Sequence, residues 1–366
     1  MRVLIVVTHL LGTGHLVRAV TLGRAFAQRG WQVQIASGGR PVPHLDTSGV
    51  TLTQLPPLHV EGVDFGTLFG PSGPADARYR QARIAQLLAC LEPAPDLIIT
   101  ELFPFGRRNL RDEFLALLDA RSAPVLASVR DILAPPSKPE RAAWTHEVLR
   151  RHYRGVLIHA DPTVIPLEQS WPVSPDIAPR LHYTGFVAPP TPEPHPQNDG
   201  KGEVLISAGG GPVGAALLAA AKSAAALDPD RVWRCLIREC DADLSANLPN
   251  NLRIEAPRPD FRQMLCGAYA SVSMCGYNTA MDLMQTGVPA VLVPFDEGGE
   301  VEQSMRADAL ARHPGFVVLR RANLNGHSLR EAVQRVTIQP RRASQTQAMN
   351  GAEKTVEIAE KLLHAR

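Results

Sequence analysis

Short apolar segments recur along the whole chain, and each is followed by a segment of helical pattern or by an irregular loop. Each has the length of a strand and is apolar enough to be buried on both faces of a sheet. In the first half they lie at 3–7, 31–37, 95–100, 123–129, 155–160 and 181–187. In the second half they lie at 203–207, 232–237, 251–256, 270–274, 290–295 and 315–319. Strands that alternate with helices predict parallel sheets, so the expected fold class is α/β with two Rossmann-like domains.

A stretch rich in proline and glycine separates the two series of segments. This stretch, 188–202, reads APPTPEPHPQNDGKG and has almost no apolar content, which is typical of a linker. We therefore predict one domain over 1–187, a second domain over 203–345, and a C-terminal helix at 346–366 whose end is amphipathic. Ligands of such sheets bind beyond the carboxyl ends of the strands, which predicts a site in a cleft between the two domains.

Length, composition and charge limit the class of protein. The chain has 366 residues, which is long for a single core. Hydrophobic content of 45% and charged content of 20% are typical of a globular protein. No apolar run reaches the ~18 residues that span a bilayer. A net charge of +2 gives no indication of nucleic acid as a partner. Five scattered cysteines, with no signal-peptide pattern, predict reduced thiols and a cytoplasmic location.

The first apolar segment leads into a glycine-rich turn, Gly12-Thr13-Gly14-His15, and then into a helical pattern with Gly30 at the position of a C-terminal cap. Such a turn brings backbone N–H groups close to an anion. A dinucleotide fingerprint would require glycine in place of Val17 and an acidic residue after the second strand. The second strand ends in Ala36-Ser37-Gly38, so NAD is not an expected ligand.

His15 is the unusual member of this turn. A neutral imidazole at a cleft can take the proton from an attacking hydroxyl. It can instead donate to a phosphate of the leaving group, or simply bond to its own turn at the start of a helix. Because the imidazole follows a glycine turn at a strand end, we favour a role in the reaction, with the glycines giving both substrates room to approach it.

Glycine and polar residues also follow the strands of the second half. The turn Gly209, Gly210 and Gly211 leads into an alanine-rich helix, and free N–H groups there suit a diphosphate, although a flexible turn has the same pattern. Polar residues follow the next two strands, at Asp282, Glu302, Gln303 and Arg306. Because parallel strands end at one edge of their sheet, we expect these residues to share a single pocket.

Five motifs together resemble GT-B glycosyltransferases of family 28, the group of the peptidoglycan N-acetylglucosaminyltransferase MurG. They are GTGH at 12–15, YTGF at 183–186, GGGPVG at 209–214, CGYNTAMDLMQTGVP at 275–289 and EQSMRADAL at 302–310. The resemblance covers nearly the whole chain and is strongest to bacterial proteins described as predicted glycosyltransferases. It implies an acceptor-binding first domain, a second domain that binds a nucleotide-sugar, commonly a UDP-sugar, and a last helix that packs back on the first domain.

The resemblance implies roles for several donor-binding residues. The turn at 209–211 corresponds to the family's diphosphate loop, and Gly276, Asn278 and Thr279 correspond to a second turn near the donor phosphates. Gly14 is also assigned to the donor-binding residues. In this chain a single glycine, Gly14, comes directly before His15, whereas relatives of MurG tend to have two glycines before the histidine.

Four more positions of the second half correspond to donor contacts of the family. Asp282 stands where the family has a glutamate that holds both ribose hydroxyls. Gln303 matches a glutamine that reads hydroxyls of the donor sugar, and the backbone at Pro259 and Asp260 matches the segment that reads the base. Arg306 stands where the family often has asparagine.

The acceptor side is less well defined by the sequence. Glu101 ends a strand and arginines follow it between 107 and 111, which is consistent with a loop for an anionic acceptor group or with a basic helix start. The acceptor-side candidates are Glu101, Arg107, Arg130 and Asp131. The acceptor itself, a small molecule or a lipid-linked one, is not readable, and the segment 64–88 is only mildly apolar, so docking on a membrane stays open.

The expected function is metal-independent transfer of a sugar from a nucleotide-diphosphate donor, such as a UDP-sugar similar to UDP-N-acetylglucosamine, to an acceptor hydroxyl or amine. The resemblance implies inversion, with His15 as the base and no cofactor. Asp241-Ala242-Asp243 imitates a metal motif of another glycosyltransferase fold but is expected to be a solvated loop. Two alternatives stay open: a UDP-sugar hydrolase that uses His15 on water, and a non-catalytic nucleotide-sugar sensor.

Overall fold

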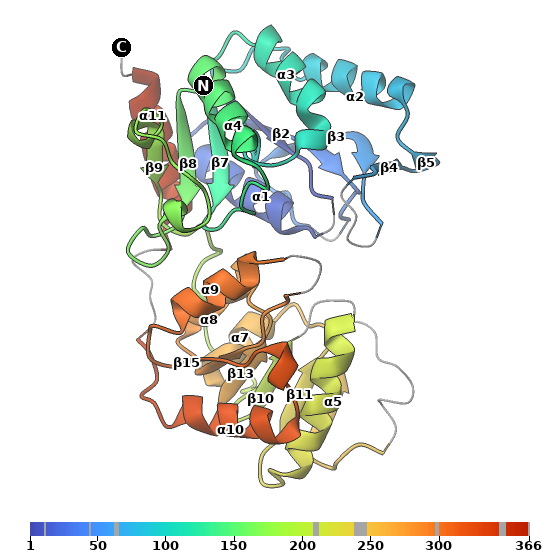
Figure 1. The fold of residues 1–366 in the computed structure, drawn as a ribbon, viewed down its shortest axis with the longest axis vertical. Helices are drawn as coiled ribbons and strands as arrows, with labels where there is room; N and C mark the ends of the chain where they lie inside the picture. Colours follow the sequence, from blue (N-terminus) through green and yellow to red (C-terminus); the bar gives the residue numbers. More distant parts are fainter. Residues whose placement is uncertain are drawn as a thin grey trace. The chain divides into compact units, whose positions relative to one another are not determined.

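The protein consists of two compact units, each built on one parallel sheet. The computed structural model describes residues 1–10, 12–43, 45–61, 66–207, 212–237, 247–296, 300–343 and 349–364. The first unit is Met1–Pro189 with Asn350–Arg366, and the second is Pro190–Met349 (Figure 1). Every strand pair within each of the two sheets is parallel, which confirms the predicted α/β fold class.

The sheet of the first unit has the strand order β3-β2-β1-β6-β7-β8-β9. Its strands are β1 (Arg2–Val7), β2 (Gln32–Gly39), β3 (Thr51–Leu58), β6 (Leu97–Glu101), β7 (Val125–Arg130), β8 (Gly155–His159) and β9 (Leu181–Tyr183). The strand order reverses at β1: from β1 the chain adds β2 and β3 on one side, and then β6 to β9 on the other side. Such a reversal is the place where open α/β sheets bind their ligands, just beyond the strand ends.

The edge strand β3 is not among the segments that the apolar pattern predicts. Its sequence is TLTQLPPL, and the prolines at 56 and 57 argue against a central strand. At an edge the outer side of a strand needs no partner, so proline is tolerated there. The buried guanidinium of Arg83 donates to the carbonyl oxygens of Pro56 and Gly38 and so ties β3 to the end of β2.

The described part of the first unit contains five α-helices. They are α1 (Gly14–Gln28), α2 (Ala77–Ala89), α3 (Arg111–Ala120), α4 (Pro139–His152) and α11 (Gly351–His364). Along β1, Val3, Ile5 and Val7 pack against the apolar faces of α1 and α11, and the intervening Leu4 and Val6 are fully buried as well. Both faces of β1 are therefore covered, as its continuous apolar run predicts. The described short elements are a hairpin, β4 (Phe69–Gly70) with β5 (Gly73–Pro74), and the 3₁₀ turns η1 (Arg108–Leu110), η2 (Leu167–Gln169) and η3 (Ala178–Arg180).

The C-terminal helix α11 belongs to the first unit. Gly351 at its start donates its N–H to the carbonyl oxygen of Phe186 at 3.0 Å, and Asn350 forms a β-bridge with Val187. A Cβ at Gly351 would lie 2.5 Å from the carbonyl oxygen of Gly185, so only glycine fits this approach. The indole Nε1 of Trp31 donates to Glu360 at 3.4 Å. The helix thus closes the α1 side of the first sheet after the chain has formed the second unit.

The second unit has the strand order β12-β11-β10-β13-β14-β15, with the same reversal at its first strand. Its strands are β10 (Val204–Ser207), β11 (Trp233–Leu236), β12 (Leu252–Glu255), β13 (Ala270–Ser273), β14 (Ala290–Leu292) and β15 (Phe316–Val318). Its described helices are α5 (Pro212–Ala226), α7 (Phe261–Gly267), α8 (Tyr277–Thr286), α9 (Glu302–Leu310) and α10 (Gly326–Thr337), with the 3₁₀ turn η4 (Arg321–Asn323). Trp233 is fully buried in a core that α5 and α10 share with the sheet.

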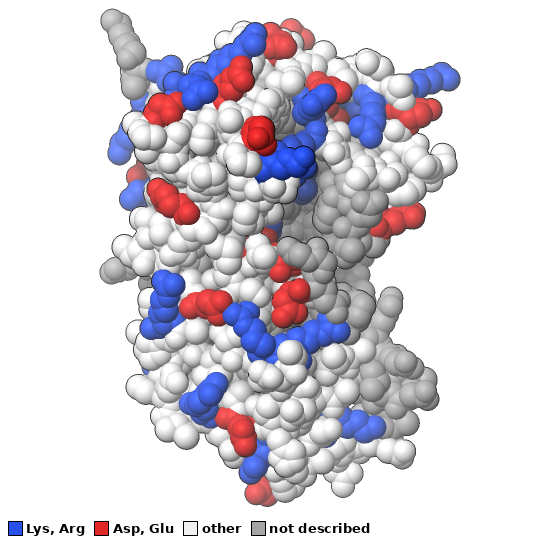
Figure 2. Space-filling model, in the orientation of Figure 1, with Lys and Arg blue, Asp and Glu red and all other residues white. Residues whose placement is uncertain are grey.

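Charged side chains of both signs are interspersed over the face shown in Figure 2, in keeping with a net charge of +2. Among the described helices, none combines the length and the apolar content that crossing a membrane requires.

Candidate active site

His15 and Glu101 meet at the carboxyl-end edge of the first sheet. His15 is the second residue of α1, which follows β1. Glu101 is the last residue of β6, the neighbour of β1 in the sheet. The Nδ1 of His15 lies 2.8 Å from Oε1 of Glu101. A carboxylate only accepts hydrogen bonds, so Nδ1 carries the proton and Nε2 has the free lone pair. The Nη2 of Arg18 lies 3.1 Å from the same Nδ1 and then donates to Glu101 and not to the ring.

The Nε2 of His15 has no hydrogen-bond partner within the described residues, and the His15 side chain keeps 13% of its surface exposed. A neutral imidazole with one buried nitrogen donating to a carboxylate and one nitrogen free is arranged to accept a proton from outside. Once protonated, the ring would face the negative charge of Glu101 across the same hydrogen bond.

A buried chain of hydrogen bonds continues behind Glu101. Ser128 on β7 donates to Oε2 of Glu101 at 2.5 Å. Its oxygen lies 2.9 Å from Nε2 of His159, the last residue of β8. The Nδ1 of His159 lies 2.9 Å from the hydroxyl of Thr184. With Ser128 donating to Glu101, a neutral His159 donates from Nε2 to Ser128 and accepts from Thr184. Glu101 is thereby fixed from the side opposite His15.

Burial and nearby charges set the ionisation of this group. The pKa of His15 is lowered to about 3, mainly by burial, which outweighs the raising effect of the hydrogen bond to Glu101, and in smaller part by the positive charge of Arg107. Burial also lowers the pKa of His159 to about 3. Burial alone would raise the pKa of Glu101, but the adjacent Arg18 and the bond from His15 hold it below its usual range. Near pH 7 both imidazoles are neutral and Glu101 is a carboxylate.

The acceptor-side candidates occupy different positions around this group. Glu101 is 2% exposed and both of its oxygens are bound by protein groups, which argues against a direct contact with an acceptor. The Nε of Arg107 donates to the carbonyl oxygen of Thr8 at 2.7 Å. Arg130 ends β7, and its charge lowers the pKa of His15 and of Arg107. Asp131 is fully buried and accepts from the N–H of Ile132 at 2.9 Å, which argues against an acceptor contact.

A pocket of about 270 Å³ lies at the strand ends of the second unit. Ser207 ends β10, Leu236 ends β11, and Met274 follows β13, so three adjacent strands reach it. The remaining lining residues are Pro257, Arg258, Phe261, Asn278, Thr279 and Asp282. Asn278, Thr279 and Asp282 thus share one pocket on the first turns of α8, of which Gly276 is the N-cap. The glycines at 209–211 and the pair Asp241 and Asp243 lie outside the described residues.

Asp282 is held by an arginine that the sequence did not single out. The Nε of Arg262 donates to Oδ1 of Asp282 at 2.6 Å, and its Nη2 donates to Gln285 at 2.6 Å. Burial raises the pKa of Asp282, and the charge of Arg262 opposes that rise. Within the described residues Oδ2 has no partner. The carboxylate is therefore oriented by α7 while one oxygen still faces the pocket.

The segment before α7 is fixed by a cluster of charges. Asp260, the N-cap of α7, accepts from Arg258 at 2.6 Å and lies 3.0 Å from Nε2 of His195. These bonds, that of Arg258 first, hold the pKa of Asp260 below its usual range. The side chain of Asp260 is thus used inside the unit, and Pro259 lies between two residues, Arg258 and Asp260, whose side chains are joined.

Gln303 bridges two loops, whereas Glu302 and Arg306 do not join the pocket. The Oε1 of Gln303 accepts from the N–H groups of Cys275 and Phe295, both at 3.1 Å. Arg306 is fully buried and donates to Glu302 and to the carbonyl oxygen of Cys275, both at 2.8 Å. The expectation of a single pocket is wrong for this pair, because the i, i+4 spacing on α9 lets them neutralise each other inside the unit.

Residues 259–362 match the model of the glycosyltransferase family 28 C-terminal domain. This match covers less than half of the chain. Solved glycosyltransferases of the GT-B fold match over nearly the whole chain, so the protein has the GT-B fold. A comparison with curated proteins found no match in sequence.

Three solved structures illustrate this likeness in fold. MurG from Acinetobacter baumannii is 16% identical, with a TM-score of 0.60 over 99% of this chain and 100% of MurG. The glycosyltransferase VinC, solved in complex with dTDP, is 18% identical, with a TM-score of 0.62 over 99% of each chain. UGT2 from Phytolacca americana, solved with UDP-2-fluoro-glucose and pterostilbene, is 14% identical, with a TM-score of 0.64 over 98% of each chain. At these identities the likeness concerns the fold.

Four residues of the two sites were missed by sequence reasoning. Ser128 and His159 lie at the ends of predicted strands, and Arg18 lies one helical turn after His15, so polar residues near strand ends were a usable signal for three of them. Arg262 gave no such signal, because its partner Asp282 is on another helix.

Proposed function

We propose that the protein is a metal-independent glycosyltransferase that moves a sugar from a nucleoside-diphosphate donor to an acceptor hydroxyl or amine, with inversion. The family 28 C-terminal domain and the GT-B fold support a glycosyltransferase with a nucleotide-sugar donor. The observation that carries the proposed mechanism is the contact between Nδ1 of His15 and Oε1 of Glu101.

In the proposed reaction, Nε2 of His15 removes the proton from the acceptor group. The freed electron pair of the acceptor forms a bond to C1 of the sugar, while the bond between C1 and the β-phosphate oxygen breaks and its electrons leave with the nucleoside diphosphate. One displacement of this kind inverts C1. The imidazolium that forms is stabilised by the carboxylate of Glu101, which Ser128 and Arg18 keep ionised and in place.

The second unit is proposed to hold the nucleotide. Asn278 and Thr279 lie on the first turn of α8, where free backbone N–H groups and the helix dipole favour phosphate. The free Oδ2 of Asp282 suits a ribose hydroxyl, with Arg262 fixing the carboxylate. The backbone near Pro259 and Asp260 is proposed to meet the base, and Gln303 to meet the sugar. Backbone dipoles of this kind stabilise a leaving diphosphate without a cation.

Release of nucleoside diphosphate from a panel of UDP-sugars and dTDP-sugars separates the possible activities. The protein is incubated with each donor, with and without a mixture of alcohols, phenols and amines as acceptors. Release that depends on an acceptor supports the transferase. Equal release without acceptor would show a hydrolase, and donor binding without turnover would show a sensor.

A further inference from the structure

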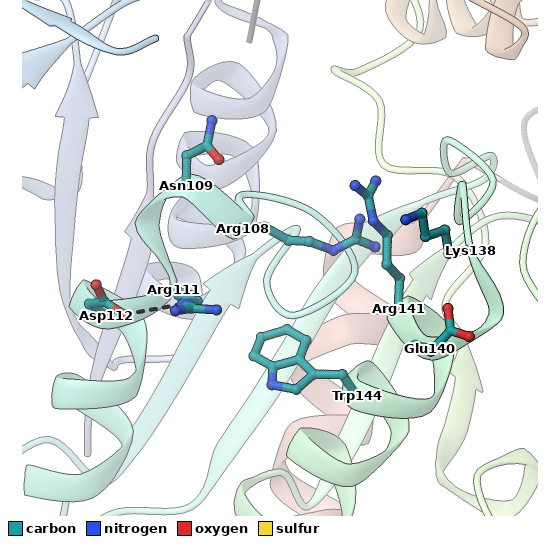
Figure 3. Close-up of a pocket in the computed structure, with 8 residues that line it drawn as sticks. All are labelled: Arg108, Asn109, Arg111, Asp112, Lys138, Glu140, Arg141 and Trp144. Carbon is teal, nitrogen blue, oxygen red and sulfur yellow. Dashed lines mark hydrogen bonds and ion pairs between the residues drawn. The ribbon is translucent and has the colours of Figure 1, made fainter. Parts of the chain in front are cut away.

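The first unit has a pocket of its own, apart from the His15 group, with a volume of about 490 Å³. It is lined by Arg108, Asn109, Arg111, Asp112, Lys138, Glu140, Arg141 and Trp144. In Figure 3 the side chains of Arg108, Lys138 and Arg141 point toward one another, and the indole of Trp144 lies beside them. A volume of this size fits a small organic ligand.

The three converging cations are not paired with a carboxylate of the described residues, although Asp112 and Glu140 line the same pocket. Within the described residues, Arg108, Lys138 and Arg141 form no ion pair, whereas Arg111 already pairs with the adjacent Asp112 at 3.3 Å. Glu140 points away from Arg108 in Figure 3. The Nε of Arg108 is buried and has no hydrogen-bond partner in the part of the chain that the structure describes. Burial lowers the pKa of Arg108, and the nearby positive charge of Arg141 lowers it as well.

Two of the three cations belong to the start of α4. Lys138 is the N-cap of α4 and makes no side-chain cap, and Arg141 lies on the first turn. The helix start itself offers few donors, because Pro139 has no N–H and Arg141 donates its N–H to the carbonyl oxygen of Lys138 at 3.1 Å. An anion placed between Arg108 and Arg141 would therefore meet two guanidinium groups and one ammonium group. Guanidinium groups bind phosphate oxygens in a bidentate manner.

Trp144 gives the pocket an aromatic wall that the rest of the unit holds in place. It lies three residues after Arg141 on α4, so both side chains are on the same face of the helix. The indole packs edge-on against Phe103, with ring centroids 6.0 Å apart, and Phe103 stacks on Phe114 at 4.4 Å. A fixed aromatic surface beside a cationic cluster suits a ligand that joins an anionic group to a flat or apolar group.

The pocket and the His15 group are connected by one short segment. Glu101 ends β6, and Arg108 begins η1 seven residues later. Arg107, the residue before Arg108, lies close enough to His15 for its charge to lower the pKa of the imidazole. A ligand held at Arg108 is therefore on the side of the unit where the proposed base lies.

We propose that this pocket binds the phosphate group of an acceptor that carries a flat or apolar group, with the phosphate between Arg108, Lys138 and Arg141 and the apolar group on Trp144. As an acceptor site it rests on the proposed function; as a binding site it does not. The acceptor class is then an organic phosphate with a free hydroxyl, and the phosphate fixes the orientation of that hydroxyl.

Calorimetric titration of the whole protein with phenyl phosphate tests the binding site, in the presence of saturating UDP so that the donor site is occupied. Phenyl phosphate is expected to bind, and inorganic phosphate and phenol are each expected to bind at least tenfold more weakly. The double variant R108Q/R141Q should lose at least tenfold in affinity for phenyl phosphate. W144A should lose affinity for phenyl phosphate but keep that for inorganic phosphate. R151Q, which removes an exposed arginine from the far end of α4, should bind as the wild type does.

Unchanged affinity in R108Q/R141Q, or an equal loss in R151Q, would overturn the site. The acceptor role is tested by donor turnover with 4-hydroxyphenyl phosphate and with hydroquinone, which present the same phenol with and without the phosphate. A preference of tenfold or more for the phosphate that disappears in R108Q/R141Q is expected, and equal turnover would overturn the acceptor role. Failure of UDP to bind in a separate titration would count against the proposed function alone, because phenyl phosphate binding does not depend on it.

Discussion

At the level of single residues, His15 and Asp282 are the residues to which we assign the chemistry of the two units, and each contacts one charged neighbour. Glu101 fixes the tautomer of His15 and would face the imidazolium of the proposed reaction. Arg262 fixes Asp282 and leaves one carboxylate oxygen free. The first pair would act on the transition state, and the second on binding of the donor. The two substitutions below therefore change different kinetic constants.

His15→Ala should leave the affinity for UDP nearly unchanged and lower kcat by on the order of 10²–10⁴, which is the usual effect of removing a general base. Steady-state kinetics with saturating donor measures kcat, and titration measures the affinity. His364→Ala, at the exposed end of α11, is the control and should keep wild-type values. Loss of UDP binding in His15→Ala with kcat preserved would reverse the role given to this residue.

Asp282→Ala should raise KM for the donor with little change in kcat, because the proposed ribose contact is present in the ground state and in the transition state. Loss of a hydrogen bond to a charged group costs roughly 1.5–3 kcal/mol, or about 10- to 100-fold in KM. Asp308→Ala removes a carboxylate of the same unit whose ion pair with Arg320 lies at the surface, and its KM should not change. An unchanged KM in Asp282→Ala would contradict the proposed contact between Asp282 and the ribose.

At the level of elements, the strands were largely predictable because each central strand is a continuous apolar run that no helix period explains. The edge strand β3 was not predictable, because Pro56 and Pro57 are unfavourable in a strand. They are tolerated here only because β3 lies at the edge of the sheet. The ends of β6 and β8 marked Glu101 and His159 as strand-end residues, but their partners depend on strand order, which no local pattern encodes. The same holds for Arg262 and Asp282, on neighbouring helices of the second unit.

Gly351→Ala should destabilise the first unit, because the added methyl would lie 2.5 Å from the carbonyl oxygen of Gly185 and 2.7 Å from Phe186 at the start of α11. Overpacking against backbone costs about 1–3 kcal/mol. Thermal unfolding should show a lower Tm, and Lys354→Ala, an exposed neighbour on α11, should unfold like the wild type. An unchanged Tm in Gly351→Ala would mean that α11 does not need this close approach.

At the scale of the whole molecule, a falling pH should lower the free energy of unfolding of the first unit before Glu101 takes up a proton. His15 and His159 have folded pKa values of about 3, below the value of about 6.5 for an unfolded histidine, so the unfolded chain takes up protons first. The contribution of these two neutral imidazoles to the free energy of unfolding is therefore fully present above pH 6.5, and it is lost as the pH falls toward 3. By pH 5 the loss is about 2 kcal/mol for each histidine. Glu101, whose pKa is lowered, adds to the loss only below about pH 4.3.

Chemical denaturation at pH 7.5, 6 and 5 measures this dependence. The variant His159→Gln should have a smaller slope of stability against pH in this range, whatever its stability at pH 7.5. Part of the slope should remain, because burial also lowers the pKa of His9, His152 and His182. A wild-type slope near zero between pH 6.5 and 5 would contradict the neutral, buried state of the two imidazoles and with it the proposed base.

Calorimetric titration of the wild-type protein with UDP, dTDP and NAD, in buffer that contains EDTA, tests the central claim most directly. Saturable binding of at least one nucleoside diphosphate is expected, because backbone N–H groups and helix N-termini are proposed to hold the diphosphate without a metal. NAD should not bind, and a nucleoside diphosphate at 100 times its Kd should add roughly 2.7 kcal/mol of stability. Binding of NAD with none of UDP or dTDP, or nucleotide binding that EDTA abolishes and magnesium restores, would contradict a metal-independent nucleotide-sugar transferase.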